Sequence, residues 1–322
     1  MNPSPIPRVR IVLGFLAIYL IWGSTYLAIR YAIETLPPLL MAASRWIVPG
    51  LAFIIWARMR ENAPAPTAEH WKTTALIGIF LLLGGNGIVS WAEQWVLSGW
   101  AALLIATVPL WMALLQWGTA RAHGRRHSLA PLAALGILLG FAGVGILLAA
   151  SGKMGSSGAP MDSRNIFGSF MLVLAALLWA IGSLYSRKAA LPSSPILATG
   201  MEMLCGGIAL LVLGTFTGEW SRVQLSHVSP RSLWALLYLM SFGSVLGFSA
   251  YVWLLRVSSP EKVSTYAYVN PVVAVFLGWI AGGEPVTPGV LAATAVIVGS
   301  VVLITSARHH VDRNGRRRSE QR

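Results

Sequence analysis

The chain has 322 residues, of which 56% are hydrophobic and only 11% are charged. A soluble domain carries about 25% charged residues, so this composition excludes a water-soluble globular fold. The formal net charge is +13, and the presence of one cysteine, Cys205, excludes an intrachain disulfide.

Ten apolar runs between polar or Pro/Gly breaks predict ten membrane-spanning helices, because each is close to the roughly 20 residues that a helix needs to cross a bilayer. The first run follows Arg8 and Arg10 as a signal peptide would, but it is too long, and no A-x-A-like cleavage site follows it. We therefore expect it to be retained. The expected spans are residues 10–33, 38–57, 72–91, 97–119, 129–150, 166–186, 196–215, 232–255, 262–281 and 287–306.

A low-complexity stretch, SGKMGSSGAPMDSRN at 151–165, divides the spans into two sets of five. An offset of 157 residues aligns Trp22 with Trp179, Pro38 with Pro195, and Arg45 with Glu202, and an offset of 162 aligns Gly85 with Gly247 and Pro109 with Pro271. Since each set has an odd number of spans, the second is inverted, as in many transporters. We predict an all-α integral membrane protein of ten transmembrane helices, with five-helix repeats over 1–150 and 166–306, a linker over 151–165 and a basic tail over 307–322.

The distribution of Lys and Arg predicts the orientation, because cytoplasmic loops keep positive charge during insertion. Most of these residues fall in the loops that are cytoplasmic if the N-terminus is inside. We expect a bacterial inner-membrane protein with both termini in the cytoplasm. We interpret the tail HHVDRNGRRRSEQR as a segment attracted to anionic lipid, which fixes the orientation of the chain, rather than as a nucleic-acid-binding segment.

Arg45 and Glu202 are charged residues within predicted spans, and each lies seven residues beyond an aligned proline, Pro38 or Pro195. At 1.5 Å per residue this depth is roughly 10 Å, and because the repeats are inverted both side chains are expected near the midplane. They form either a structural ion pair or part of a substrate path. If only one binds substrate, Arg45 favours a carboxylate, and Glu202 favours an amine or a proton.

Three polar residues are expected at the outer rim of the bundle. Arg30 lies four residues before Glu34, a spacing that allows a local ion pair as well as a role toward substrate. Glu93 and Gln94 end the third span, where water can reach them, and are predicted to be gate or rim residues.

Polar and aromatic residues also share helix faces. Trp22, Tyr26 and Arg30 follow four-residue steps, as do Tyr266 and Asn270, and such mixed rows suit a partly wet cavity more than a lipid-facing belt. Glycines and prolines inside spans mark either hinges and cavity walls or ordinary kinked packing. These residues are Gly84, Gly85, Gly87, Pro109 and Pro271.

Missing motifs argue against several classes of protein. All six histidines fall in predicted loops or tails, which disfavours an intramembrane hydrolase, haem protein or metalloenzyme. The sequence contains no G-x-x-x-x-G-K-[ST] motif for nucleotide phosphates. We therefore predict no catalytic residues, no metal and no cofactor.

Six segments together resemble the EamA group of the drug/metabolite transporter superfamily, and within it the YedA-like bacterial exporters. The resemblance implies ten helices, cytoplasmic termini, a central cavity formed by both halves, and export of amino acids or related compounds. One departure is that TARAHGRRHSLAP at 119–131 lacks a counterpart of Glu284, so a role for this glutamate is not expected in both halves. The segments are IWGSTYLAIR at 21–30, GGNGIVSWAEQ at 84–94, SGWAALLIATVPL at 98–110, WAIGSLYSR at 179–187, STYAYVNPVVAVFLG at 264–278 and GGEPVTPG at 282–289.

The leading hypothesis is a secondary exporter of small metabolites, including drugs, that works by alternating access. Glu202 is the first candidate for proton coupling, although a facilitator without coupling fits equally well. The alternatives are a channel or membrane receptor and, last, an intramembrane enzyme. The expected partners are a small solute, the bilayer and, for a coupled carrier, a proton, and a homodimer is compatible with the sequence. The predicted path residues are Trp22, Thr25, Tyr26, Arg45, Asn86, Glu202, Tyr266 and Asn270.

Overall fold

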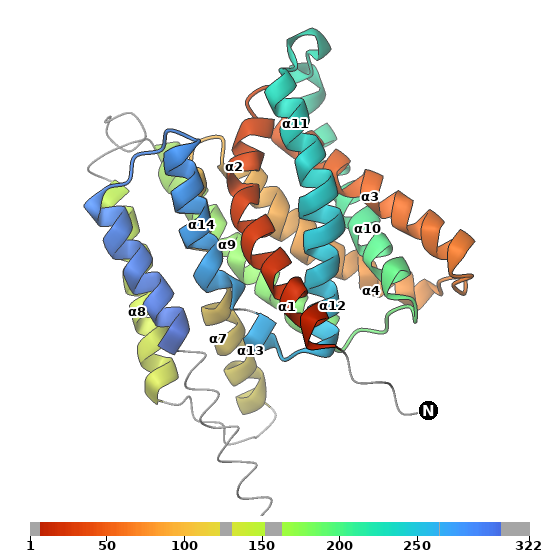
Figure 1. Ribbon diagram of the computed structural model, residues 1–322, viewed down its shortest axis with the longest axis horizontal. Coiled ribbons are helices and arrows are strands. Elements are labelled where there is room, and N and C mark those ends of the chain that lie inside the picture. The colour runs from red at the N-terminus through yellow and green to blue at the C-terminus, as the bar shows by residue number, and fades with distance from the viewer. Residues whose placement is uncertain (1–6, 123–130, 152–162, 264, 304–322) are drawn as a thin grey trace, which may run out of the picture.

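The computed structural model describes residues 7–122, 131–151, 163–263 and 265–303, and within these ranges it consists of helices and loops without a strand. The helices lie side by side in one bundle (Figure 1). Seven are long and apolar enough to cross a membrane, and three shorter apolar helices accompany them, at Ala134–Leu147, Val269–Ile280 and Pro288–Leu303. The predicted all-α membrane fold is confirmed.

The first half contains spans one to five, three of which combine several helical segments. Span one consists of α1 (Arg8–Leu16), the π-helical η1 (Ala17–Ile21) and α2 (Trp22–Ala32), and span two is α3 (Pro38–Arg60). Span three consists of α4 (Ala68–Gly78), the π-helical η2 (Ile79–Gly87) and α5 (Ile88–Ala92). Span four is α6 (Ser98–Ile105) with α7 (Val108–Ala122), and span five is α8 (Pro131–Ser151).

The second half repeats this layout. Spans six and seven are α9 (Ser163–Ser186) and α10 (Pro195–Phe216), and the 3₁₀ turns η3 (Glu219–Arg222) and η4 (Leu225–His227) follow. Span eight consists of α11 (Pro230–Tyr238), the π-helical η5 (Leu239–Phe248) and α12 (Ser249–Val257). The short α13 (Pro260–Val263) leads into span nine, α14 (Tyr266–Ile280), and Pro288–Leu303 is span ten. The linker from 152 to 162 and the basic tail lie outside the described residues.

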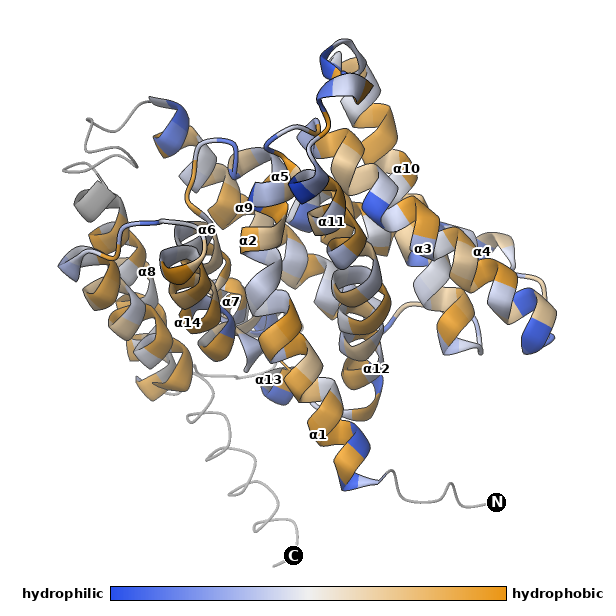
Figure 2. Ribbon diagram, turned by 45° about the horizontal axis from the view of Figure 1, so that its top comes forward, coloured by the Kyte–Doolittle hydropathy of each residue, from blue (hydrophilic) through white to orange (hydrophobic). Residues whose placement is uncertain are grey.

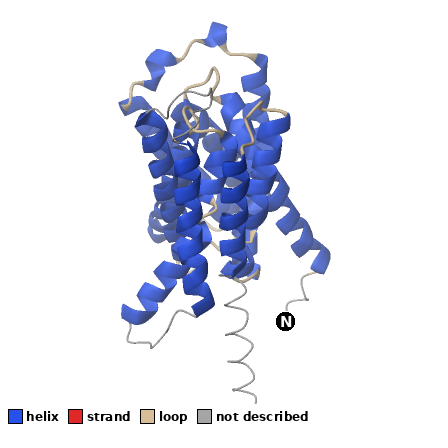
Figure 3. Cartoon of the chain, turned by 90° about the vertical axis from the view of Figure 1, so that its left-hand side faces the viewer, coloured by secondary structure: helices blue, strands red, loops and turns tan. Residues whose placement is uncertain are grey.

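The outer surface of the bundle is apolar. Large side chains such as Val12, Phe170 and Trp279 are more than half exposed, and Figure 2 shows hydrophobic residues covering the outward faces of the helices. A surface of this kind would be unstable in water but matches lipid, and helices suit lipid because they satisfy their own backbone hydrogen bonds. Figure 3 shows the helices running between two ends of the bundle. We call the end where α1 begins and α12 ends the basic end, and the other the opposite end.

The packing between the halves has the symmetry that the repeat predicts. Span one contacts spans eight and nine, and its counterpart, span six, contacts spans three and four. Spans two and seven, which are themselves counterparts, pack against each other as α3 and α10. This exchange of equivalent partners places the residues of both halves around one central region.

Glycines allow α3 and α10 to approach closely. A Cβ atom on Gly50 would lie 2.8 Å from the Leu204 nitrogen, and one on Gly207, its counterpart at an offset of 157, would lie 2.9 Å from the Ile47 nitrogen. Backbone atoms cannot move aside as a flexible side chain can. Small residues at such crossings are what membrane helices use to pack tightly.

We expect Gly50→Ala to destabilise the protein by about 1–3 kcal/mol, because overpacking at a tight contact forces the backbone to shift. Chemical denaturation of the purified protein in detergent would measure this loss. Gly145→Ala in α8 is the matched control, since a Cβ there meets nothing within 4 Å. Equal stability of the two variants would contradict the close approach of α3 and α10.

Gly140 in α8 also packs within the chain. A Cβ on it would lie 2.3 Å from Leu110 and 2.9 Å from Ser300, so this glycine contacts spans four and ten. Gly136 and Gly140 form a G-x-x-x-G pattern in the fifth span, and at Gly140 this pattern has an intramolecular role. A homodimer remains a prediction without a contact assigned to it.

Carboxylates of the loops cap helices across the halves. Glu219 accepts hydrogen bonds from the backbone nitrogens of Leu39 and Leu40 at the start of α3, at 2.9 and 3.0 Å. Burial raises the pKa of Glu219, although these two N–H groups act in the other direction. At the basic end Ser194, the N-cap of α10, donates to Glu61 at 2.6 Å. The two contacts hold α3 and α10 at both of their ends.

Candidate functional site

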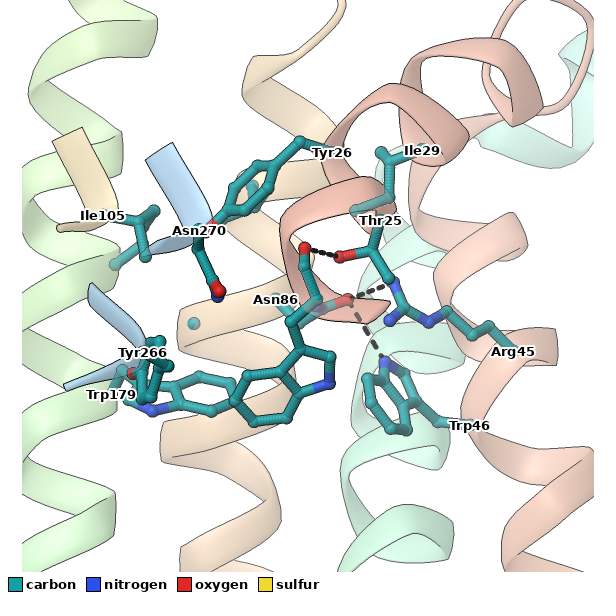
Figure 4. Close-up of a pocket in the computed structure, with 14 residues that line it drawn as sticks. Thr25, Tyr26, Ile29, Arg45, Trp46, Asn86, Ile105, Trp179, Tyr266 and Asn270 are labelled. Carbon is teal, nitrogen blue, oxygen red and sulfur yellow. Dashed lines mark hydrogen bonds between the residues drawn. The ribbon is translucent and has the colours of Figure 1, made fainter. Parts of the chain in front are cut away.

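A narrow cavity lies at the centre of the bundle, between the two halves (Figure 4). About 50 Å³ is open to the centres of water molecules. Since one water needs about 10–15 Å³ of such space, the cavity holds a few waters in this conformation. Spans one, two, three, four, six and nine contribute its lining, which consists of Trp22, Thr25, Tyr26, Ile29, Arg45, Trp46, Gly85, Asn86, Val89, Ile105, Ala175, Trp179, Tyr266 and Asn270.

Seven of the eight predicted path residues line this cavity, the exception being Glu202. They come from spans one, two, three and nine, so the meeting of these four groups is a property of the fold and not of local sequence. The π-helical stretches help to form it: a Cβ on Gly85 in η2 would lie 2.6 Å from the Trp179 ring, and one on Gly247 in η5 would lie 2.5 Å from the Trp22 ring. The predicted repeat is thus visible as two equivalent glycine–tryptophan contacts.

Arg45 supplies the positive charge of the cavity and is only 1% exposed. Its Nε donates to Ser244 at 3.2 Å, one terminal nitrogen donates to Asn86 Oδ1 at 3.2 Å, and the guanidinium lies 4.7 Å from the Trp46 ring centre. No carboxylate lies within 4.0 Å of it among the described residues. A buried guanidinium held by neutral oxygens retains its charge for an incoming anion.

Asn86 and Asn270 hold the cavity walls in place. Asn86 Oδ1 accepts from both Arg45 and the Trp46 indole nitrogen, the latter at 3.4 Å. The Asn270 amide nitrogen, in the orientation that satisfies the side chain, donates to the carbonyls of Ile18 and Tyr19 at 3.1 and 2.9 Å. Both carbonyls belong to η1, where the π-helical turn changes the usual backbone hydrogen bonds.

Four aromatic side chains form a cluster on the basic-end side of the cavity: Trp22, Trp179, Tyr251 and Tyr266, called the aromatic plug below. Ring centres are 4.9 Å apart for Trp22 and Tyr251, and 5.5 Å apart for Trp22 and each of the other two. The Tyr251 hydroxyl accepts from the Trp179 indole at 3.1 Å and shares a 2.6 Å hydrogen bond with Ser183. The plug is therefore held by hydrogen bonds as well as by ring packing.

Tyr251 was not predicted. One aromatic residue in an apolar run gives no separate indication of a site, and the counterpart of Tyr251 in the first half was not predicted either. An offset of 162 relates Tyr251 to Val89, and Val89 lines the cavity from the first half.

The prediction that Glu202 lies with Arg45 is wrong. Glu202 makes no ion pair with Arg45, and it lines a different cavity together with Arg187 and Arg256. Glu202 is 1% exposed, but its position along the helix does not say which way its side chain points. It faces α12 and the end of α9 instead of the central cavity.

The prediction that water reaches Glu93 is also wrong. Glu93 is 4% exposed, and neither carboxylate oxygen makes a well-aligned hydrogen bond, although the backbone of Arg30 lies near the carboxyl. Arg30, Arg45 and Glu284 are the charged groups whose electrostatic influence reaches it. The loop after α5 turns this side chain inward, toward the region between the central cavity and the opposite end. Its neighbour Gln94 does lie at the surface, where Arg222 donates to it at 3.3 Å.

Arg30 pairs with a distant residue and not with Glu34. One of its terminal nitrogens lies 2.9 Å from Glu284 Oε1, while Glu34 pairs with Arg231 at 3.4 Å. Glu284 also accepts from the nitrogen and hydroxyl of Ser98, at 2.8 and 2.7 Å, and from the Gly99 nitrogen, at 3.0 Å. It caps α6 and thereby joins the second half to spans one and four of the first.

The described residues contain no group of three or more His, Cys, Asp or Glu side chains that could hold a metal ion. The chemistry available at the centre is therefore that of one guanidinium, two amides, hydroxyls and aromatic faces. Such groups bind and orient a small polar solute.

The family model described as EamA-like transporter family matches residues 9–149 and 166–306, which is one match for each half of the bundle. The chain belongs to the EamA-like transporter family. This membership confirms the predicted resemblance and supports a transporter role.

Several curated relatives match almost the whole chain. The chain is 37% identical over 295 residues to the uncharacterized inner membrane transporter YedA of Escherichia coli K12, covering 91% of this chain and 90% of that one. It is 23% identical to the uncharacterized transporter YoaV of Bacillus subtilis, with 92% and 97% covered. A solved structure titled "Crystal structure of protein" has a TM-score of 0.63 at 20% identity and covers 93% of this chain and 99% of its own, which shows the shared fold.

Proposed function

We propose that the chain is a secondary exporter that moves small metabolites across the bacterial inner membrane by alternating access, with both termini in the cytoplasm. The observation that carries this proposal is the position of the Arg45 guanidinium in a cavity enclosed by both inverted halves. Amino acids and related compounds, including drugs that carry an anionic group, are the proposed cargo.

The size of the central cavity supports a carrier over a channel. Its free volume accommodates a few waters, so a solute has to be admitted by movement of the halves. The aromatic plug blocks one side, and the contacts of Glu284 join the halves on the other. A pathway that is closed on both sides of its site is the arrangement that alternating access requires.

Counterflow in liposomes tests this proposal. Vesicles containing the purified protein are loaded with unlabelled amino acids, and uptake of the labelled compound from outside is measured. We expect transient accumulation that saturates with concentration, because an occupied carrier exchanges its cargo. Unsaturable flux without counterflow would indicate a channel, and chemical conversion of the solute would indicate an enzyme.

Two buried carboxyls, Glu93 and Glu202, lack hydrogen-bond partners and are the proposed positions for a coupling proton. An unpaired buried carboxyl is more stable when it is neutral, and it loses its proton when a cationic group binds beside it, so such groups suit an exchange of a proton for a cationic group of the solute. An imposed pH gradient that drives uphill transport in the wild type, but not in Glu93→Gln, would support coupling through Glu93. Uphill transport in both proteins would show that coupling does not depend on Glu93, and a wild type that does not respond to the gradient would indicate facilitated diffusion.

A further inference from the structure

A second, larger cavity lies on the basic-end side of the aromatic plug. About 420 Å³ of it is open to the centres of water molecules, compared with about 50 Å³ in the central cavity. Its lining includes the exposed residues Arg187 and Arg256 and the buried residues Leu81 and Glu202. We call it the vestibule.

The vestibule and the central cavity are separated by the plug, and spans three and six line both of them. In span eight, Tyr251 belongs to the plug and Leu255, one turn nearer the basic end, lines the vestibule. In span three, Gly85 lines the central cavity and Leu81 lines the vestibule. In span six, Trp179 lines the central cavity and Ser186 lines the vestibule. The two cavities therefore follow one another along the bundle with four aromatic rings between them.

Glu202 is the feature of the vestibule that packing does not explain. Both of its oxygens are buried and without a hydrogen-bond partner. Arg256 is the cation whose electrostatic influence reaches Glu202, yet the two do not approach within 4.0 Å, and neither Arg187 nor Arg256 pairs with an acid in the part of the chain that the structure describes. A carboxylate and two guanidiniums thus face one cavity without neutralising each other.

We propose that the vestibule is a second solute-binding site, which takes a small molecule carrying both an ammonium and a carboxylate group. The ammonium donates to Glu202, and the carboxylate lies between Arg187 and Arg256. This inference rests on the proposed function, because it makes the vestibule the place where cargo binds before it passes the plug.

The chemistry selects this class over simpler ions. A lone cation would satisfy Glu202 but would be repelled by the two arginines, and a lone anion would leave the buried carboxylate without a donor. An amphoteric solute supplies three donors for Glu202 and two acceptors for the arginines. Discrimination by buried polar groups is strong, since a ligand lacking the matching group leaves them unpaired.

Thiol labelling tests the site without relying on transport. Ser186→Cys is introduced into a Cys205→Ala chain, so that the vestibule carries the sole thiol. Its labelling rate is measured with two methanethiosulfonates, one bearing an ammonium and one a sulfonate. Glu202→Gln should lower the ammonium-to-sulfonate ratio of labelling rates about tenfold, and Arg256→Gln should raise it. The reason is that charged side chains lining a cleft change the local concentration of ions by about tenfold or more. A thiol at exposed Ala65 serves as the control, and its ratio should stay constant in all variants.

Protection by three related probes tests the class of solute. L-Alanine should slow labelling of Ser186→Cys, whereas ethylamine, which lacks the carboxylate, and propionate, which lacks the amine, should protect much less. The proposal would be overturned if propionate protected as well as L-alanine does, or if Glu202→Gln left the ammonium-to-sulfonate ratio of labelling rates unchanged. Counterflow without these labelling effects would remove the second site only, and labelling effects without counterflow would remove the exporter proposal only.

Discussion

Replacing Arg45 with alanine should lower the rate of transport of an anionic or amphoteric solute by about ten- to a hundredfold. The guanidinium is buried and its two observed partners are neutral oxygens, so it is free to bind a carboxylate. A hydrogen bond to a charged group contributes about 1.5–3 kcal/mol, and 1.4 kcal/mol corresponds to a factor of ten. Initial rates of counterflow in liposomes, corrected for the amount of protein incorporated, would measure the loss.

The controls separate charge from shape and site from surface. Arg45→Lys keeps the charge but not the planar fork of donors, and should fall between alanine and the wild type. Arg58→Gln removes an arginine at the basic end, whose observed contact is with the Ala63 carbonyl, and should transport normally. Wild-type rates in Arg45→Ala would show that the central cavity is not the substrate site.

Replacing Glu284 with alanine should lower the free energy of unfolding by about 3 kcal/mol, the lower part of the range for breaking a buried pair. Glu284 is 6% exposed and Arg30 is 33% exposed, so the ion pair itself is partly screened. The larger share of the loss comes from Ser98 and Gly99, whose backbone donors at the start of α6 would lose their acceptor. Denaturation in detergent would measure the change.

The matched variant is Glu34→Ala, which removes the other ion pair at the same end of the bundle. Its partner is Arg231, and the two side chains are 40% and 53% exposed. Exposed pairs typically contribute less than about 1 kcal/mol, so this variant should be nearly as stable as the wild type. If both substitutions had the same small effect, Glu284 would be an ordinary surface residue and not a connection between the halves.

The path residues were predictable where the repeat and helical periodicity acted together. Trp22, Tyr26 and Asn270 were predicted because four-residue steps place residues on one face, and Trp179, which the repeat aligns with Trp22, was not itself predicted as a path residue. All four line the central cavity. The division at 151–165 remains a prediction, because most of that segment lies outside the described residues.

The errors arose where the direction of a side chain depends on tertiary packing. Glu202 was predicted beside Arg45, but it faces the vestibule. Glu93 was assigned to the rim, because a loop residue is usually exposed, and it is buried. Arg30 had a suitable partner four residues away in Glu34, yet it binds Glu284, which is 254 residues away. Sequence spacing identifies local partners and contains no information about competition from distant ones.

Spans one and nine are connected unequally along their length. Toward the opposite end Arg30 binds Glu284, beside α14, and the Tyr31 hydroxyl donates to the Ala281 carbonyl at 2.5 Å. Toward the basic end the contacts of the described residues are neutral: Tyr19 bonds Thr265, and the Asn270 amide donates to the Ile18 and Tyr19 carbonyls. Outward opening therefore breaks an ion pair, whereas inward opening breaks neutral hydrogen bonds, and we expect the inward-open form to be the more stable of the two. For an exporter, the unloaded protein would then spend most of its time facing the compartment where its cargo is made, and only bound cargo would supply the free energy to turn it outward.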